Sequence, residues 1–151
     1  MGKAGRAGLR AAFTGLLALV LLALKACSAP ATEDALRETI AGMQAAAEQR
    51  DAAALAGSLS EDFVGPEGMD RDQFRRMAAV IWLREREVGV SLGPLDVAMV
   101  GPEGARVEFT AATRGGEGWL PDRAQVYRVK TGWRLEGGEW KLLTATWEPA
   151  L

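Results

Sequence analysis

The sequence predicts an α+β domain in which three helices precede a meander of antiparallel strands. Residues 33–86 place apolar side chains at three- and four-residue steps, the spacing of one helix face. From residue 88 the pattern changes to extended runs rich in β-branched and aromatic residues, and residues 125–148 form the clearest of these. With 151 residues, 48% apolar and 25% charged, the chain has room for one globular domain.

Each helix has a recognisable start. Thr32 is predicted to cap a helix that begins at Glu33, and Asp51 to cap a second, shorter one. Asp70, followed three residues later by Gln73, is a variant of the capping box and marks the third start. The predicted inward-facing residues are Leu36, Ile40, Met43 and Ala47, then Leu55 and Leu59, then Phe74, Met77, Ala78 and Ile81 in a helix that ends near Arg86.

The last two strands are predicted to form a hairpin around the loop Gly137-Gly138. Glycines supply the positive φ values that a tight hairpin turn needs, and alternating side chains on each strand share one face. In one continuous register, counted outward from this loop, the facing pairs are Leu135 with Trp140, Trp133 with Leu142, Thr131 with Thr144, and Val129 with Thr146.

The N-terminus is typical of a secretory signal peptide. Lys3, Arg6 and Arg10 precede a short apolar run at residues 11–24, which ends in small residues. A membrane-spanning helix needs about 20 apolar residues, so this run is short for a span. Cys27 follows it and is the only cysteine, which excludes an intramolecular disulfide.

Leu24-Lys25-Ala26-Cys27 resembles the lipobox of bacterial lipoproteins, although Lys25 replaces a small or apolar residue. The resemblance implies cleavage before Cys27 and its lipidation, palmitate included. The chain then divides into a signal peptide at 1–26, a tether at 27–31 and a domain at 32–151. Ser28 resembles the signal for transfer to the outer membrane, which predicts an envelope lipoprotein facing the periplasm. The alternatives are an uncleaved inner-membrane signal anchor and later cleavage near residues 29–31.

The charge of the processed chain excludes one class of partner. Four of the 18 basic residues lie within residues 1–26, so 14 remain against 20 acidic residues, a net charge near −6. Phosphate backbones would repel such a domain, and nucleic acid is therefore not expected as a partner.

Two stretches, in this order, resemble the nuclear transport factor 2-like superfamily, which includes ketosteroid isomerase and polyketide cyclases, the SnoaL-like proteins. The first runs from residues 48–55 to Glu61-Asp62-Phe63-Val64, and the second from Gly132-Trp133-Arg134 through residues 138–142. The resemblance covers residues 32–148. It implies a strongly bent antiparallel sheet, wrapped around the three helices into a cone with a pocket at its mouth. It also implies homodimers through the sheet.

The chain contains no histidine, which excludes Ser-His-Asp and Cys-His catalysis and removes the commonest metal ligand. No metal or cofactor is expected. In the isomerase branch, a carboxylate soon after the second helix is the general base, and the resemblance makes Glu67 its nearest counterpart by position. Glu67, however, lies in Gly-Pro-Glu-Gly, which is typical of a solvated turn.

The favoured function is a non-enzymatic domain that binds a small apolar ligand or a protein. The alternatives are an isomerase- or cyclase-like enzyme with Glu67 as general base, and a purely structural dimer. Tryptophans could line a pocket or fill the core or a dimer interface, and Arg128 could receive an anion or join a dimer salt bridge. The candidate ligand-binding residues are Trp119, Tyr127, Trp133 and Arg128.

Overall fold

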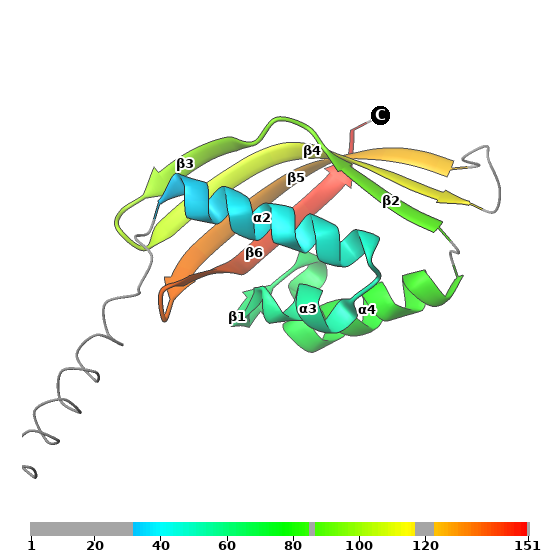
Figure 1. Cartoon of the computed structure of the whole chain (residues 1–151), viewed down its shortest axis with the longest axis horizontal. Helices are drawn as coiled ribbons and strands as arrows, with labels where there is room; N and C mark the ends of the chain where they lie inside the picture. The colour runs from blue at the N-terminus through cyan, green and yellow to red at the C-terminus, as the bar shows by residue number, and fades with distance from the viewer. Residues whose placement is uncertain (1–31, 85–86, 117–122, 151) are drawn as a thin grey trace, which may run out of the picture.

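The computed structural model of the chain describes residues 32–84, 87–116 and 123–150 (Figure 1). The predicted signal peptide, Cys27 and its tether, and Trp119 lie outside these residues. Within them, no helix has the length and apolar character needed to cross a membrane. The elements are helices α2 (Glu33–Glu48), α3 (Ala52–Gly57) and α4 (Arg71–Arg84), the 3₁₀ turn η1 (Pro66–Gly68), and strands β1 (Leu59–Val64), β2 (Glu87–Leu92), β3 (Asp96–Val100), β4 (Gly104–Gly116), β5 (Arg123–Glu136) and β6 (Glu139–Pro149).

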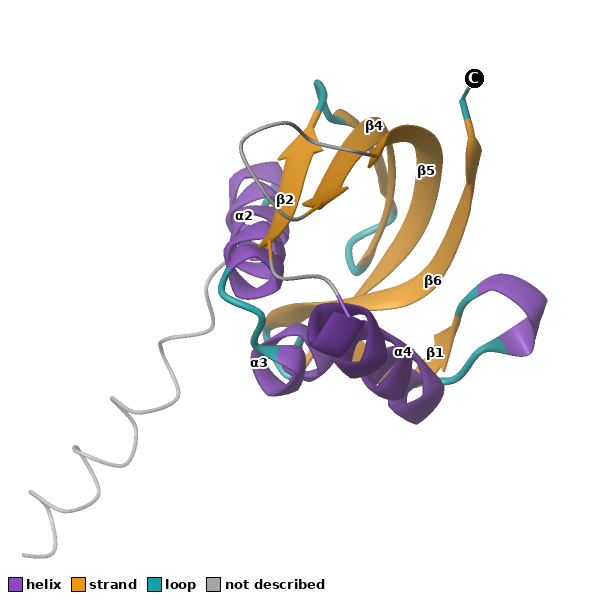
Figure 2. Cartoon of the chain, turned by 90° about the vertical axis from the view of Figure 1, so that its right-hand side faces the viewer, coloured by secondary structure: helices purple, strands orange, loops and turns teal. Residues whose placement is uncertain are grey.

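The strands form one curved sheet in the order β1-β6-β5-β4-β2, and β3 also pairs with β4. All neighbours are antiparallel except β1, which runs parallel to β6 and makes the sheet mixed. The long strands β4, β5 and β6 bend together, and the helices lie on their concave side (Figure 2). The predicted architecture of three helices on a strongly bent sheet is confirmed.

The predicted helix starts are confirmed in detail. Thr32 and Asp51 each accept a hydrogen bond from the backbone N–H three residues on, at 3.2 and 2.9 Å. Asp70 and Gln73 exchange side chain to backbone bonds of 2.7 and 2.8 Å, as a capping box requires. The assignment of Leu59 to the second helix was wrong. Leu59 begins β1, because α3 ends at Gly57.

The hairpin has the predicted loop but not one continuous register. Pairing follows the prediction through Trp133 and Leu142, and then Gly132 pairs with Thr144, so Leu143 is one extra residue in β6. Such a β-bulge shifts every later residue by one and reverses the face on which its side chain lies. The predicted facing pairs of Thr144 and Thr146 were therefore wrong, and both side chains are exposed.

Gly132 permits the close approach at the bulge. A Cβ atom on Gly132 would lie 2.5 Å from the Thr144 hydroxyl oxygen, too near for unstrained contact. Beyond the bulge, Ala145 pairs with Thr131 and Trp147 with Val129, so these residues of β6 turn to the concave face. The bulge thus places Trp147 beneath the helices.

Two clusters of buried side chains form the core, and one of them joins a helix to the sheet. The larger joins Leu36 and Ile40 of α2 to Val107, Trp133 and Trp140 of the sheet. The smaller lies between α2, α3 and α4. Its members are Ala46, Leu55, Ala78 and Trp82. The space between α4 and the sheet is not filled by either cluster.

Candidate functional site

A cavity of about 570 Å³ lies between α4 and the concave face of the sheet. Its volume falls within the range of about 300–1,000 Å³ that is usual for small-molecule sites. Most side chains around it are apolar, and a few polar ones lie together on the sheet. The cavity is the candidate site.

One wall of the cavity is the inner face of α4. Phe74, Met77, Ala78 and Ile81 line it at the spacing of one helical stripe, as the sequence predicts, and Trp82 adds a fifth side chain. Ile81 is still 43% exposed, which places it at the opening, whereas Ala78 and Trp82 are buried. The stripe that the sequence assigns to the core therefore also bounds an open space.

The opposite wall comes from alternate residues of the long strands. Ala111, Tyr127 and Val129 face the cavity from β4 and β5. The bulge in β6 adds Trp147, whose ring meets Phe74 edge-on at a centroid distance of 6.5 Å. Without the extra residue in β6, Trp147 would lie on the outer face of the sheet.

The polar part of the lining is formed by Thr113, Gln125 and Tyr127. Thr113 and Gln125 are direct partners across β4 and β5, so their side chains lie on the same face. The Tyr127 hydroxyl donates a hydrogen bond to Gln125 Oε1. Arg114 also borders the cavity, but its guanidinium donates to the Ser91 hydroxyl at 3.3 Å, on the opposite face of the sheet.

Of the sequence-predicted ligand residues within the described chain, only Tyr127 lines the cavity. Trp133 is 5% exposed and lies in the main core, where its Nε1 donates to Thr131 Oγ1 at 2.8 Å. Arg128 is exposed on the outer face of the sheet, with Glu148 at 3.9 Å. The structure therefore separates these three residues.

Glu67, the candidate general base, lies in η1 and is exposed. Its backbone φ is 57°, and the adjoining Gly68 also has a positive φ, as expected of a tight turn. Glu67 does not border the 570 Å³ cavity. The solvated turn that the sequence indicates at Glu67 is therefore the local structure there.

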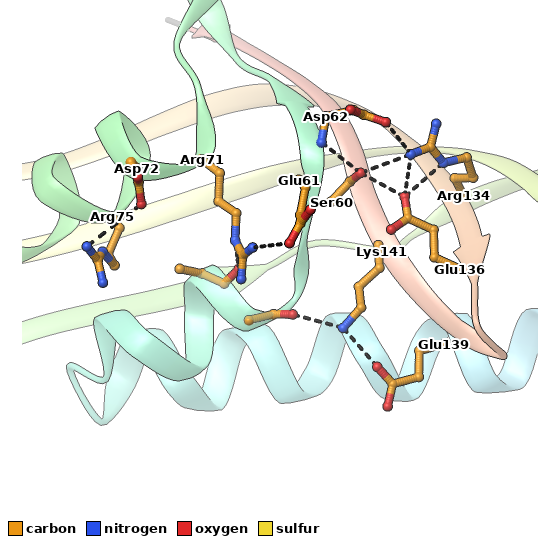
Figure 3. Close-up of polar contacts among 12 residues, drawn as sticks. Ser60, Glu61, Asp62, Arg71, Asp72, Arg75, Arg134, Glu136, Glu139 and Lys141 are labelled. Carbon is orange, nitrogen blue, oxygen red and sulfur yellow. Dashed lines mark hydrogen bonds and ion pairs between the residues drawn. The ribbon is translucent and has the colours of Figure 1, made fainter.

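A second polar cluster fixes β1 to the hairpin (Figure 3). Ser60, which is 1% exposed, donates to Glu136 at 2.7 Å and accepts from Arg134 at 3.2 Å. Arg134 also contacts Asp62 at 2.8 Å and Glu136 at 2.6 Å. The hydrogen bond from Ser60, aided by that from Arg134, holds the pKa of Glu136 below its ordinary value. Hydrogen bonds to Asp62 and Glu136 raise the pKa of Arg134.

This cluster gives Arg134 partners within its own chain. Ser60 is too buried to meet a substrate. The cluster therefore has a structural role, since its bonds join strands that are distant in sequence. Within residues 32–84, 87–116 and 123–150, no three His, Cys, Asp or Glu side chains are grouped closely enough to hold a metal ion.

No protein-family model matches the sequence, and no curated protein matches it. Solved structures resemble its fold. The Bd1075 protein of Bdellovibrio bacteriovorus shares 13% identity at a TM-score of 0.68, over 77% of this chain but 40% of its own. A Novosphingobium aromaticivorans protein, provisionally named a scytalone dehydratase, shares 14% identity at 0.71 over 78% and 83% of the two chains. A Pseudomonas putida nuclear transport factor 2-like protein of unknown function shares 19% identity at 0.65, over 77% and 84%.

At these identities the likeness concerns the fold alone. The nuclear transport factor 2-like architecture that the sequence motifs imply is confirmed.

Proposed function

We propose that this nuclear transport factor 2-like domain binds a small, largely apolar ligand in the cavity beneath α4, without converting it chemically. The observation that carries the proposal is the cavity itself, about 570 Å³ in volume and lined mainly by apolar and aromatic side chains. A concave apolar site with a few convergent polar groups is the usual form of a small-ligand site.

The absence of an acid–base pair in the cavity supports binding rather than catalysis. Among the described residues, no carboxylate or imidazole side chain borders the cavity. Proton transfer during catalysis most often uses such a group within hydrogen-bond reach of the substrate, and the Tyr127 hydroxyl of the lining already donates to Gln125 Oε1. Glu67, on its exposed turn, supplies none there, so the geometry does not favour the isomerase- or cyclase-like alternative.

The proposal includes attachment to the cell envelope. A lipid on Cys27 would tether the domain through residues 27–31 to the outer membrane, on its periplasmic side, and the basic start and apolar run of residues 1–26 support this. Membrane fractionation of wild type and Cys27→Ser tests the attachment. We expect the variant to leave the membrane fraction. A variant that stays there with unchanged mass would indicate an uncleaved signal anchor.

A homodimer through the outer face of the sheet also belongs to this proposal. That face carries charges of both signs, including Arg128 with Glu148 and Lys130 with Glu108 at 3.9 and 3.7 Å. Sedimentation analysis at several concentrations tests the dimer. A domain that remains monomeric would overturn the proposed dimer and leave the proposed ligand binding intact.

Filling the cavity provides the test of binding. N-phenyl-1-naphthylamine, an uncharged probe that fluoresces in apolar surroundings, should bind the wild-type domain. Ala111→Phe projects a ring into the cavity and should weaken probe binding at least about tenfold, because the ligand and the ring compete for one space. Ala98→Phe is the matched control, since Ala98 is an exposed alanine of strand β3 that does not border the cavity. Equal binding to both variants would overturn the proposal.

A further inference from the structure

We infer that the ligand of the cavity is an uncharged aromatic molecule that carries one hydrogen-bonding group, such as a hydroxyl or carbonyl, directed at Gln125 and Thr113. This inference rests on the proposed function, because it concerns the same cavity. It specifies three properties of the ligand, namely its charge, its shape and the position of its polar group.

The charge follows from the side chains around the cavity. Arg114 is the one charged residue of its lining within the described chain, and its guanidinium is bonded to Ser91 on the other face of the sheet. Gln125 is exposed and Thr113 is half-buried, so a ligand carboxylate or ammonium at this end would lose part of its water without gaining a counter-ion. Even partial burial of an unpaired charge is unfavourable, so the cavity favours neutral molecules.

The position of the polar group follows from the hydrogen bonds that the lining already makes. Tyr127 donates its hydroxyl proton to Gln125 Oε1. The amide N–H groups of Gln125 and the hydroxyl of Thr113 have no partner in the described part of the chain, although both residues face the cavity. Because Thr113 and Gln125 pair directly across the sheet, one ligand oxygen can reach both.

The aromatic shape follows from the rings that border the cavity. Phe74, Trp82 and Trp147 border the cavity from α4 and β6. Aromatic rings favour offset-stacked or edge-on contact with other rings, and Phe74 and Trp147 already show the edge-on arrangement. A flat ring system can contact these side chains while its polar group meets the sheet.

Three ligands with one ring system separate these requirements. 2-Naphthol is neutral and polar, 2-methylnaphthalene is neutral and apolar, and 2-naphthoate is anionic at pH 7.5. Displacement of N-phenyl-1-naphthylamine measures their affinities on one scale. We expect 2-methylnaphthalene to bind roughly 3- to 10-fold more weakly than 2-naphthol, as one neutral hydrogen bond implies. We expect 2-naphthoate to bind at least about tenfold more weakly than 2-naphthol.

Substitutions of Gln125 and Thr113 test whether these two residues cause the preference for 2-naphthol over 2-methylnaphthalene. Gln125→Leu and Thr113→Val should each reduce the advantage of 2-naphthol over 2-methylnaphthalene, because each removes one of the two groups that meet the ligand oxygen. Thr146→Val is the control, because Thr146 is an exposed strand threonine outside the cavity. Gln125→Lys supplies a cation at the polar end and should raise the affinity for 2-naphthoate several-fold.

The outcomes distinguish the two proposals. If 2-naphthoate binds wild type as tightly as 2-naphthol, or if Gln125→Leu leaves the preference for 2-naphthol intact, the inferred ligand class is wrong while the binding function stands. If neither N-phenyl-1-naphthylamine nor any of the three ligands binds the folded domain, the proposed function itself fails, and the ligand class with it.

Discussion

Removal of one buried hydroxyl should measurably loosen the attachment of β1 to the rest of the sheet. Ser60 is 1% exposed, donates to Glu136 at 2.7 Å and accepts from the Asp62 backbone N–H and from Arg134 at 3.1 and 3.2 Å. Ser60→Ala deletes all three bonds without adding bulk. We expect the free energy of unfolding to fall by about 1–3 kcal/mol, the usual result when buried polar partners lose a hydrogen bond.

The pH dependence identifies the bond that matters. Because Ser60 and Arg134 hold the pKa of Glu136 below its ordinary value of 4.5, the ionised carboxylate stabilises the fold above that pH. The contribution is lost as the pH falls through the lowered pKa of the folded state. In Ser60→Ala this pKa returns toward 4.5, so less stability remains to be lost, and the gap between wild type and variant should narrow in acid.

Urea denaturation at pH 7 and pH 3 measures this gap. Ser91→Ala is the control, because Ser91 is an exposed strand serine with one bond of 3.3 Å to its hydroxyl, and the change should cost under about 0.5 kcal/mol. A loss from Ser60→Ala that is equal at both pH values would refute the role of the Glu136 carboxylate. A loss no larger than that of Ser91→Ala would refute the cluster as a source of stability.

Three further predictions concern stability and the candidate base. Trp140→Ala should cost roughly 3–5 kcal/mol in denaturant melts, since Trp140 is 3% exposed in the main core, whereas Trp119→Ala should cost under about 1 kcal/mol; equal losses would mean that one residue is misplaced. Gly42→Ala should raise the melting temperature, by a gain of about 0.5–1 kcal/mol, because a Cβ there meets no atom within 4 Å in the middle of α2, and a lower melting temperature would contradict that open space. Glu67→Gln should leave both stability and N-phenyl-1-naphthylamine affinity unchanged, and a large loss of affinity would place Glu67 in the site.

Local chemistry explains why much of the fold could be predicted. A cap such as Thr32 or Asp51 satisfies backbone groups within three residues of itself, so its signal is complete in the sequence. The loop Gly137-Gly138 likewise fixes the hairpin, and both glycines have positive φ, at 60° and 85°. These features depend on no distant part of the chain.

Features that depend on distant contacts could not be predicted. Leu59 lies four residues after Leu55 and so mimics a helical step, yet β1 forms because β6 offers a parallel partner. The bulge at Leu143 could not be predicted, because residues suited to a strand occupy both the odd and the even positions of β6. Trp147 consequently lies on the face opposite to the one that an uninterrupted register would give it, and so reaches the cavity.

The candidate site was only partly predictable for the same reason. Tyr127 was among the candidate ligand-binding residues, and it lines the cavity. Gln125 and Thr113 are ordinary strand residues, and only their pairing across β4 and β5 makes them a polar pair within an apolar cavity. Nothing local in the sequence distinguishes Trp133, which fills the core, from a tryptophan that lines a pocket.

The most direct test of the account locates a bound ligand by NMR. With 2-naphthol added to the full domain, intermolecular nuclear Overhauser effects should connect its ring protons to the methyl groups of Met77, Ile81 and Val129, which line the cavity from both walls. The methyl group of Ala98, which is exposed on β3, should show none. Contacts from the ligand to Ala98, with none to the cavity methyl groups, would contradict the account.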